Sequence, residues 1–224
     1  MIDSQHHQRQ PGARFISFEG GEGSGKSTNI AYFCEQLADA GIDYVLTREP
    51  GGTVIAETIR DILLAHHAEP LVDMAELLLV FAARAQHVKT VILPALDQGK
   101  WVVSDRFTDA SYVYQGVARG LGDERVSVLE KLVLDQLRPD KTFLLDVPVE
   151  VGQQRAADRG ELDRFELEGS AFFQSVRDAY LARASAEPDR FAVIDASRPL
   201  DQVAAQIKAE LMSLLNIQPE HNHG

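Results

Sequence analysis

The stretch FEGGEGSGKST, residues 18–28, decides the fold of this chain. It contains the pattern G-x-x-x-x-G-K-S, which begins at Gly20 and has the spacing of a phosphate-binding loop. An apolar segment over 14–20 runs into the loop, and a helical pattern over 26–40 follows it. In that setting backbone N–H groups point at phosphate oxygens, at the positive N-terminus of the helix. The stretch therefore predicts a P-loop nucleotide-binding domain.

The residues of this loop divide into those that shape it and those that carry a charge or a hydroxyl. Its glycines permit backbone conformations and close approaches that a Cβ would obstruct. Lys26 would bridge the transferred phosphoryl group of ATP, and the hydroxyl of Ser27 would bind Mg²⁺. The predicted ATP contacts are Gly20, Gly21, Glu22, Gly23, Ser24, Gly25, Lys26, Ser27 and Thr28.

Short apolar segments alternate with longer helical patterns along the rest of the chain, which predicts βαβ units. We therefore expect an α/β protein with a three-layer P-loop NTPase fold, in which helices cover both faces of a five-stranded, mainly parallel sheet. It would form one domain over 14–215, with a lid at about 153–166 and disordered tails over 1–13 and 216–224. The predicted strands are 14–20, 43–49, 101–106, 141–147 and 190–196. The predicted helices are 26–40, 54–65, 73–97, 124–137, 149–158, 169–184 and 200–215.

The composition restricts the partners of the protein. Its 22 basic and 34 acidic residues give a net charge of −12, which argues against nucleic acid or an anionic membrane as a partner. The single cysteine, Cys34, excludes an intrachain disulfide and favours a reducing compartment. We find no apolar run near the ~20 residues of a membrane span and no secretory signal. A cytoplasmic protein is expected, one that captures anionic ligands through local arginines and backbone N–H groups.

The kind of phosphate chemistry is narrowed by a missing motif. A GTPase reads guanine with Asn-Lys-x-Asp, but Asn29, Asn216 and Asn222 are the only asparagines and none precedes a lysine. A small-molecule kinase is therefore favoured. Two alternatives stay open: a kinase for another nucleoside monophosphate, and a nucleotide-dependent scaffold that does not transfer phosphate.

The ends of two predicted strands carry residues that a second substrate would need. TREPGGT, 47–53, places Glu49 at a strand end, where open α/β sheets bind ligands, and Arg60 follows on the next helix. The segment 102–120 ends its strand with Asp105 and Arg106. An aspartate there can hold Mg²⁺ through water, and an arginine can grip a phosphate bidentately.

Two helical segments carry candidates for reading a base. Phe81 and Arg84 lie three residues apart on one face, so a ring could stack on a base while the guanidinium bonds its carbonyl edge. A core phenylalanine beside a surface arginine is the alternative. Ser111 and Gln115 lie four residues apart, and a helix would turn both toward one ligand.

The charged segment QQRAADRGELDRFE, 153–166, lies between two predicted helices. Its arginines, Arg155, Arg159 and Arg164, are suited to neutralising charge on a transferring phosphoryl group, as an arginine finger does. Closure of such a lid would also expel water. A solvated loop of paired charges is the alternative.

The motifs FEGGEGSGKST, TREPGGT, FAARAQH, SDRFTDASYVYQG and RGELDRFE together resemble bacterial thymidylate kinases, in the order and spacing of that family over residues 14–198. The resemblance implies transfer of the γ-phosphoryl group of ATP to dTMP, giving dTDP for dTTP biosynthesis, with Mg²⁺ as cofactor. It also implies a homodimer formed by apolar faces of helices such as 73–97.

The resemblance further implies roles for particular residues. Arg106 would orient the dTMP phosphate, Arg84 would read a thymine carbonyl, and Glu22 would approach the acceptor sugar and phosphate. In many family members the phenylalanine that stacks on thymine lies four residues before the arginine, where this chain has Val80. The P-loop has no arginine, as in the subgroup whose lid supplies the catalytic one.

These roles divide the expected site residues into three groups. The expected catalytic residues are Lys26, Arg106, Arg159, Arg164 and Glu22. The expected dTMP contacts are Glu49, Arg60, Phe81, Arg84, Arg106, Ser111 and Gln115. The expected Mg²⁺ ligands are Ser27 and Asp105.

Overall fold

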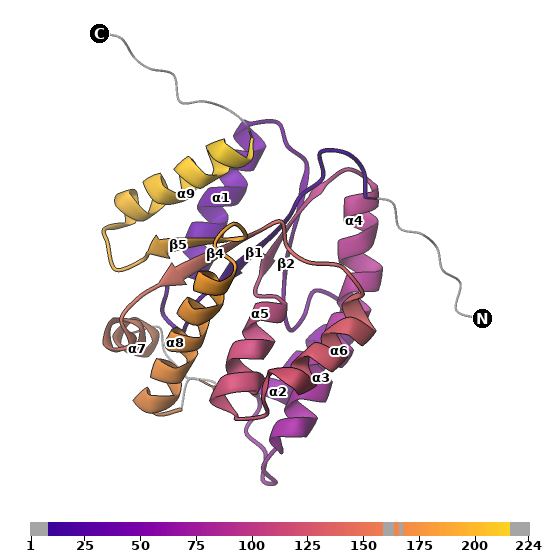
Figure 1. Ribbon diagram of the computed structural model, residues 1–224, viewed down its shortest axis with the longest axis vertical. Coiled ribbons are helices and arrows are strands. Elements are labelled where there is room, and N and C mark those ends of the chain that lie inside the picture. Colours follow the sequence, from indigo (N-terminus) through magenta and orange to yellow (C-terminus); the bar gives the residue numbers. More distant parts are fainter. Residues whose placement is uncertain (1–8, 159–163, 166–167, 216–224) are drawn as a thin grey trace, which may run out of the picture.

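The computed structural model describes residues 9–158, 164–165 and 168–215. Five parallel strands form its sheet in the order β2-β3-β1-β4-β5 (Figure 1). The strands are β1 (Phe15–Glu19), β2 (Tyr44–Arg48), β3 (Trp101–Asp105), β4 (Lys141–Asp146) and β5 (Phe191–Asp195). Because all the strands are parallel, their carboxyl ends meet at one edge, which is where such sheets bind ligands. The α/β prediction is confirmed.

Helices cover both faces of this sheet, because the central strands β1, β3 and β4 are mostly apolar and buried on both faces. On one face α1 (Lys26–Asp39) and α9 (Leu200–Leu214) pack on Ile16, Phe18 and Phe143. On the other face α8 (Ser170–Ala186) packs on Leu144 and Phe191. Figure 1 shows these two layers on opposite sides of the sheet. The remaining α-helices are α2 (Val54–Leu64), α3 (Asp73–His87), α4 (Leu93–Asp97), α5 (Thr108–Ser111), α6 (Asp123–Leu134) and α7 (Val149–Ala157).

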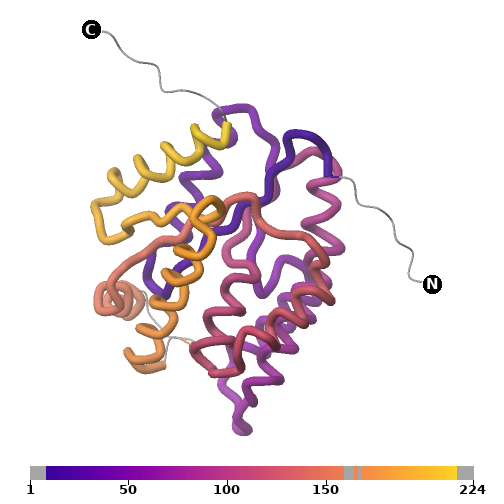
Figure 2. Tube along the Cα trace, viewed as in Figure 1, coloured from indigo at the N-terminus to yellow at the C-terminus, as the bar shows by residue number. Residues whose placement is uncertain are grey.

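The predicted helix 73–97 is one helical run that contains a π-helical turn. α3 continues through η1 (Val88–Ile92) into α4, and Figure 2 shows the chain passing through them without a break. Pro94, which has no N–H to donate to the preceding turn, is the second residue of α4 and lies two residues after this π-turn. Among the described residues, Asp73–Asp97 is the one helix with the length and composition to cross a membrane. Its side chains of Leu77, Ile92 and Leu96 are buried in the core, as in the core helix of a globular domain.

Three segments differ from the elements that the sequence predicts. Residues 108–118 form α5 and then the π-helix η2 (Tyr112–Ala118). α6 ends at Leu134 because Asp135 has a left-handed backbone, with φ of 54°. Residues 9–13, expected in a disordered tail, are in place: the N–H of Gln10 donates to the Leu96 carbonyl at 3.2 Å. Residues 1–8 and 216–224 lie outside the described part of the chain.

Three aromatic rings fill the centre of the α1 side of the core. Phe18 on β1 stacks on Phe143 on β4, with ring centroids 4.9 Å apart, and Phe33 on α1 meets both rings edge-on. All three rings are fully buried. The same rings therefore hold β1, β4 and α1 together around the start of the phosphate loop.

We expect Phe143→Ala to lower the free energy of unfolding by about 3–5 kcal/mol, because it leaves a cavity between three elements. Urea unfolding followed by circular dichroism measures this change. Val193→Ala on β5 is the matched control: its side chain is half exposed, so its cost should stay below about 1 kcal/mol. Equal costs for the two variants would contradict the central place of this cluster.

Candidate active site

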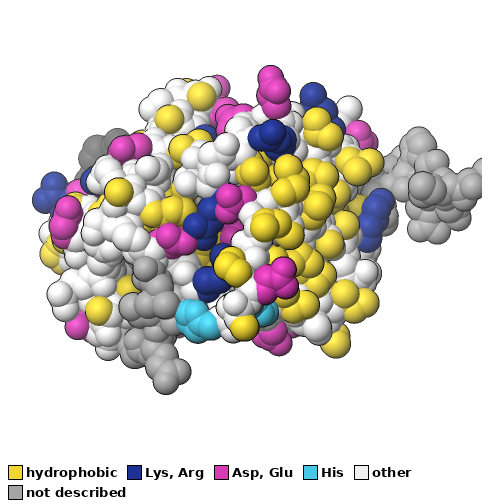
Figure 3. All heavy atoms as spheres, turned by 90° about the horizontal axis from the view of Figure 1, so that it is seen from below, with side chains coloured by type: hydrophobic (Ala, Val, Ile, Leu, Met, Phe, Trp, Pro, Cys, Tyr) yellow, Lys and Arg dark blue, Asp and Glu magenta, His cyan; other side chains and the backbone are white. Residues whose placement is uncertain are grey.

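A cavity of about 520 Å³ lies at the carboxyl edge of the sheet. The phosphate loop forms one wall, and residues that follow β2 and β3 form the others. Figure 3 shows Lys and Arg side chains gathered near the centre of the face that is viewed from below, beside a broad apolar area. Of the predicted site residues, the structure brings to this cavity Glu22, Gly23, Ser24, Gly25, Lys26, Ser27, Thr28, Glu49, Arg60, Arg84, Asp105, Arg106, Ser111 and Gln115.

The phosphate loop is fixed by its contact with α7 and by hydrogen bonds from Lys26. Gly25 caps α1 with φ of 83°, which a glycine adopts without strain. Gly23 has φ of 67°, and a Cβ on it would lie 1.9 Å from the carbonyl oxygen of Gly152 in α7. The Nζ of Lys26 donates to the carbonyl oxygens of Gly20 and Gly21 at 3.2 and 3.3 Å. The loop thus curls around its lysine and packs backbone to backbone on α7.

Arg106 has a left-handed backbone, with φ of 68°, at the end of β3. Such a conformation persists in a residue other than glycine when its surroundings fix it. Here the N–H of Arg106 donates to the Phe18 carbonyl at 2.9 Å, and its own carbonyl accepts from Ser104 Oγ at 2.7 Å. The side chain turns toward the phosphate loop, where Nη2 donates to Glu22 Oε1 at 2.6 Å.

Glu19, the last residue of β1, fixes the next peptide group. Its Oε1 accepts from the Phe107 N–H at 2.8 Å, and its Oε2 accepts from the Tyr180 hydroxyl at 2.7 Å. Burial raises the pKa of this carboxyl to about 7; the charge of Asp109 adds to the rise, and Arg106 opposes it. Our sequence analysis missed Glu19, although a carboxylate inside an apolar strand was a signal that could have found it.

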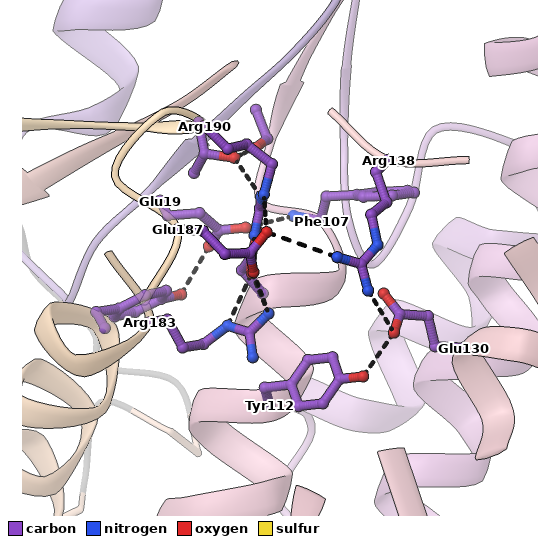
Figure 4. Close-up of polar contacts among 12 residues, drawn as sticks. Glu19, Phe107, Tyr112, Glu130, Arg138, Arg183, Glu187 and Arg190 are labelled. Atoms are coloured by element: carbon purple, nitrogen blue, oxygen red, sulfur yellow. Dashed lines mark hydrogen bonds and ion pairs between the residues drawn. The ribbon is translucent and has the colours of Figure 1, made fainter. Parts of the chain in front are cut away.

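A network of ion pairs centred on Asp109 lies next to Glu19 and Phe107 (Figure 4). The buried Asp109 pairs with Arg183 and Arg190, each at 2.6 Å, and Glu187 pairs with Arg190 at 2.9 Å. Burial alone would raise the pKa of Asp109, but hydrogen bonds from Arg190 and Arg183 hold it below its ordinary value. The network joins α5 to α8, and the sequence analysis did not find it.

Arg84 lies at the far end of the cavity and is almost fully buried. Its Nε donates to Glu49 Oε2 at 2.6 Å and its Nη1 to Ser111 Oγ at 3.0 Å. His87, one turn later on α3, bonds the other Glu49 oxygen at 2.9 Å and Thr47 at 2.6 Å. Glu49, Arg84 and Ser111 are therefore brought together as predicted, and His87 is a member that the sequence analysis missed.

The structure places Phe81 away from the cavity. Its ring is 2% exposed and packs with Leu77, Tyr112 and Val126. Val80, the preceding residue, lines the cavity in its place. The helical register explains this. Val80 lies four residues before Arg84, about one full turn, so the two side chains share a face of α3. Phe81 is rotated by about 100° from Val80 around the helix axis. This placement corrects the expectation that Phe81 faces the base.

Positive charge is concentrated at the cavity and only partly paired. Arg60 donates through Nη1 to the Pro50 carbonyl at 2.9 Å, and its pKa is lowered by burial and by the charges of Arg48 and Arg106. Burial and Arg106 likewise lower the pKa of Lys26. Because neighbouring cations lower the pKa values of Arg60 and Lys26, an anionic group would bind here favourably, since its charge relieves that repulsion.

The predicted lid arginines reach different places. Arg155 lines the cavity and donates to the Ala196 carbonyl at 3.1 Å. The Nη2 of Arg164 donates to Glu76 Oε2 at 2.6 Å, which turns its charge away from the phosphate loop. A catalytic role for Arg164 is not supported by this placement. Arg159 lies outside the described residues.

Asp105 and Ser27, the predicted Mg²⁺ ligands, both line the cavity. The Oδ1 of Asp105 is buried and has no hydrogen-bond partner among the described residues. In the described part of the chain, histidine, cysteine and carboxylate side chains form no three-residue cluster that could hold a metal. One carboxylate and a hydroxyl nevertheless fit Mg²⁺, which keeps several waters and takes its other ligands from substrate phosphates.

Comparison with known proteins gives one consistent result. The family model described as thymidylate kinase matches residues 18–207. A thymidylate kinase of Pseudomonas fluorescens is 56% identical over 201 residues, which cover 90% of this chain and 96% of that protein. Thymidylate kinases of Ectopseudomonas mendocina and Chromohalobacter salexigens are both 58% identical, again over 90% of this chain and 96% of each relative.

Glu19→Gln should change how stability depends on pH. Because the pKa of Glu19 is raised from its ordinary value of 4.5 to about 7, its contribution to stability is fully present below pH 4.5 and is lost as the pH rises through 7. The free energy of unfolding of the wild type should therefore fall relative to Glu19→Gln, by roughly 2–3 kcal/mol across that window. Urea unfolding at successive pH values measures the difference. Glu35→Gln, at an exposed position on α1, should show no such trend.

Proposed function

The chain belongs to the thymidylate kinase family, and we propose how its residues carry out the transfer of a phosphoryl group from ATP to dTMP. The enzyme is a thymidylate kinase that forms dTDP, a step of nucleotide biosynthesis. One observation carries the assignment of residues: the phosphate loop and the polar groups at the ends of β2 and β3 line a single cavity. Donor and acceptor can therefore meet inside it.

The donor phosphates are assigned to the phosphate loop. N–H groups of Gly23 to Thr28 and the Nζ of Lys26 would bind the β- and γ-phosphates at the N-terminus of α1. Ser27 and Asp105 would hold Mg²⁺, which neutralises phosphate charge and orients the oxygens that it binds. Arg159 stays a prediction for a further charge at the transferred group.

The acceptor lies on the opposite wall. Arg106 and Arg60 would bind the dTMP phosphate, which explains why a strained backbone is kept at Arg106. Arg84 would donate to a thymine carbonyl, and Val80 would pack on the ring by aliphatic contact. Glu22 would lie between both substrates, since its Oε1 already accepts from Arg106 at 2.6 Å.

The reaction follows from positioning and charge neutralisation. An oxygen of the dTMP phosphate attacks the γ-phosphorus of ATP in line with the bond to ADP, and that bond breaks as the new one forms. A phosphate oxygen is already a nucleophile near neutral pH, so the site needs no strong general base. Lys26 and Arg106 stabilise the charge on the transferred oxygens.

A panel of nucleoside monophosphates tests the proposed roles. With ATP and Mg²⁺, ADP release should be fastest with dTMP for the wild type. Lys26→Ala should lower kcat by at least about 10³-fold while the melting temperature stays within a few degrees, because the lysine belongs to the site and not to the core. Near-normal turnover by the folded variant would refute the assigned role of Lys26.

We also propose that the enzyme is a homodimer. Large apolar side chains of α2, α3 and α6 are exposed although these helices pack on one another. The broad apolar area in Figure 3 fits a self-complementary interface, as in most symmetric dimers. The exposed residues of this apolar surface are Val54, Ile55, Ile62, Met74, Leu78, Val128 and Leu132.

Leu132→Asp should convert the dimer to a monomer, because Leu132 is 78% exposed in the last turn of α6 and a buried charge opposes association. Sedimentation equilibrium gives the mass of each form. The matched control is Leu200→Asp, which alters an equally apolar, 59% exposed residue on α9, away from this surface. Its mass should equal that of the wild type, and a Leu132→Asp protein of unchanged mass would refute the interface.

A cytoplasmic location, without nucleic acid or membrane as partner, is part of the same proposal. The net charge of −12 opposes binding to polyanions, and Cys34 is a buried free thiol.

A further inference from the structure

Glu76 on α3 is a fully buried carboxylate that the reaction does not use. Its Oε1 accepts from Gln115 Nε2 at 2.8 Å, and its Oε2 accepts from Arg164 Nη2 at 2.6 Å. Arg119 Nε lies 3.6 Å from the same Oε2. A buried carboxylate is costly unless each oxygen is paired, so these partners explain how it is tolerated.

The chemistry of this pair fixes the orientation of the Gln115 amide. An ionised carboxylate can only accept hydrogen bonds, so Gln115 must turn its NH₂ group toward Glu76. Its carbonyl oxygen then lies on the opposite side of the amide. Gln115 and Arg84 both line the cavity, and among the described residues the Gln115 side chain bonds Glu76 through Nε2, which leaves its carbonyl for a ligand.

Arg164 fixes the carboxylate in turn. Its Nε donates to the Leu63 carbonyl at 2.9 Å while its Nη2 holds Glu76, so one guanidinium ties the carboxylate to α2. Its guanidinium also stacks on Phe165, 4.5 Å from the ring centroid. Glu76 therefore cannot rotate away from Gln115 without breaking contacts on two elements.

We propose that Glu76 is a specificity-determining positioning residue, which selects the acceptor base by holding the Gln115 amide in one orientation. The inference rests on the proposed function, in which the base lies against Arg84. Arg84 offers only donors, and the fixed amide offers an acceptor next to it. Thymine matches this pair with a carbonyl and a protonated ring N3. Cytosine presents an amino group and an unprotonated N3, so both contacts would be mismatched.

Glu76→Gln tests the orientation directly. The new amide can donate as well as accept, so Gln115 is free to flip and offer its NH₂ to the cavity. Isothermal titration calorimetry with each nucleotide gives the ratio of the Kd for dCMP to the Kd for dTMP. We expect that ratio to fall by about 10- to 100-fold, while the KM for ATP stays within about twofold. Glu35→Gln, exposed on α1, makes the same chemical change elsewhere and should leave the ratio unchanged.

A double-mutant cycle separates positioning from a general effect on the fold. If Glu76 acts through Gln115, Glu76→Gln should have no further effect on the ratio in a Gln115→Ala background. Arg164→Met is the second variant if Glu76→Gln does not fold. It removes the Arg164 bond to the carboxylate at a partly exposed side chain, and it should lower the ratio in the same direction by about threefold.

The outcomes are distinguishable. A folded Glu76→Gln protein with the wild-type ratio overturns the inference, and so does a fully additive effect in the Gln115→Ala background. If Glu76→Gln does not fold, an unchanged ratio in Arg164→Met overturns it. A wild type that does not phosphorylate dTMP contradicts the proposed function instead, whatever the variants show.

Discussion

The hydrogen bond from the Phe107 N–H to the buried carboxylate of Glu19 joins the two halves of this site. Glu19 ends the strand that leads into the phosphate loop, and Phe107 lies two residues after β3, which ends at Asp105. Together with the bond from the Arg106 N–H to the Phe18 carbonyl, this bond of 2.8 Å holds the residues after β3 against β1, which leads into the phosphate loop. The peptide groups on both sides of Arg106, whose backbone is left-handed, are therefore fixed to β1.

Most of the fold could be predicted, because its signals are local. An apolar strand that runs into a glycine-rich loop fixed β1 and α1 to within one residue at each boundary. The short apolar segments between helical patterns identified the other strands in the same way. The π-turns η1 and η2 could not be predicted, since they depend on packing against neighbouring helices and on Pro94, whose effect is not visible in apolar spacing.

Site residues that belong to one sequence motif could be predicted. Residues that only the fold brings together were harder to predict. Lys26, Arg84 and Arg106 all line the cavity. Phe81 and Val80 differ by one helical step, which residue type alone does not resolve. Glu19 and Glu76 have partners 88 and 39 residues away in the chain, so only the tertiary structure shows what they bind.

The packing of the phosphate loop on α7 has a mechanical consequence. A Cβ at Gly23 would meet the Gly152 carbonyl at 1.9 Å, and a Cβ at Gly152 would meet the Glu22 carbonyl at 2.5 Å. Two backbones in such contact leave no slack, so a displacement of the loop must displace α7 as well. That helix carries Arg155 and ends at Ala157. The positions of the loop and of Arg155 are therefore coupled through backbone contact, without any side chain as intermediary.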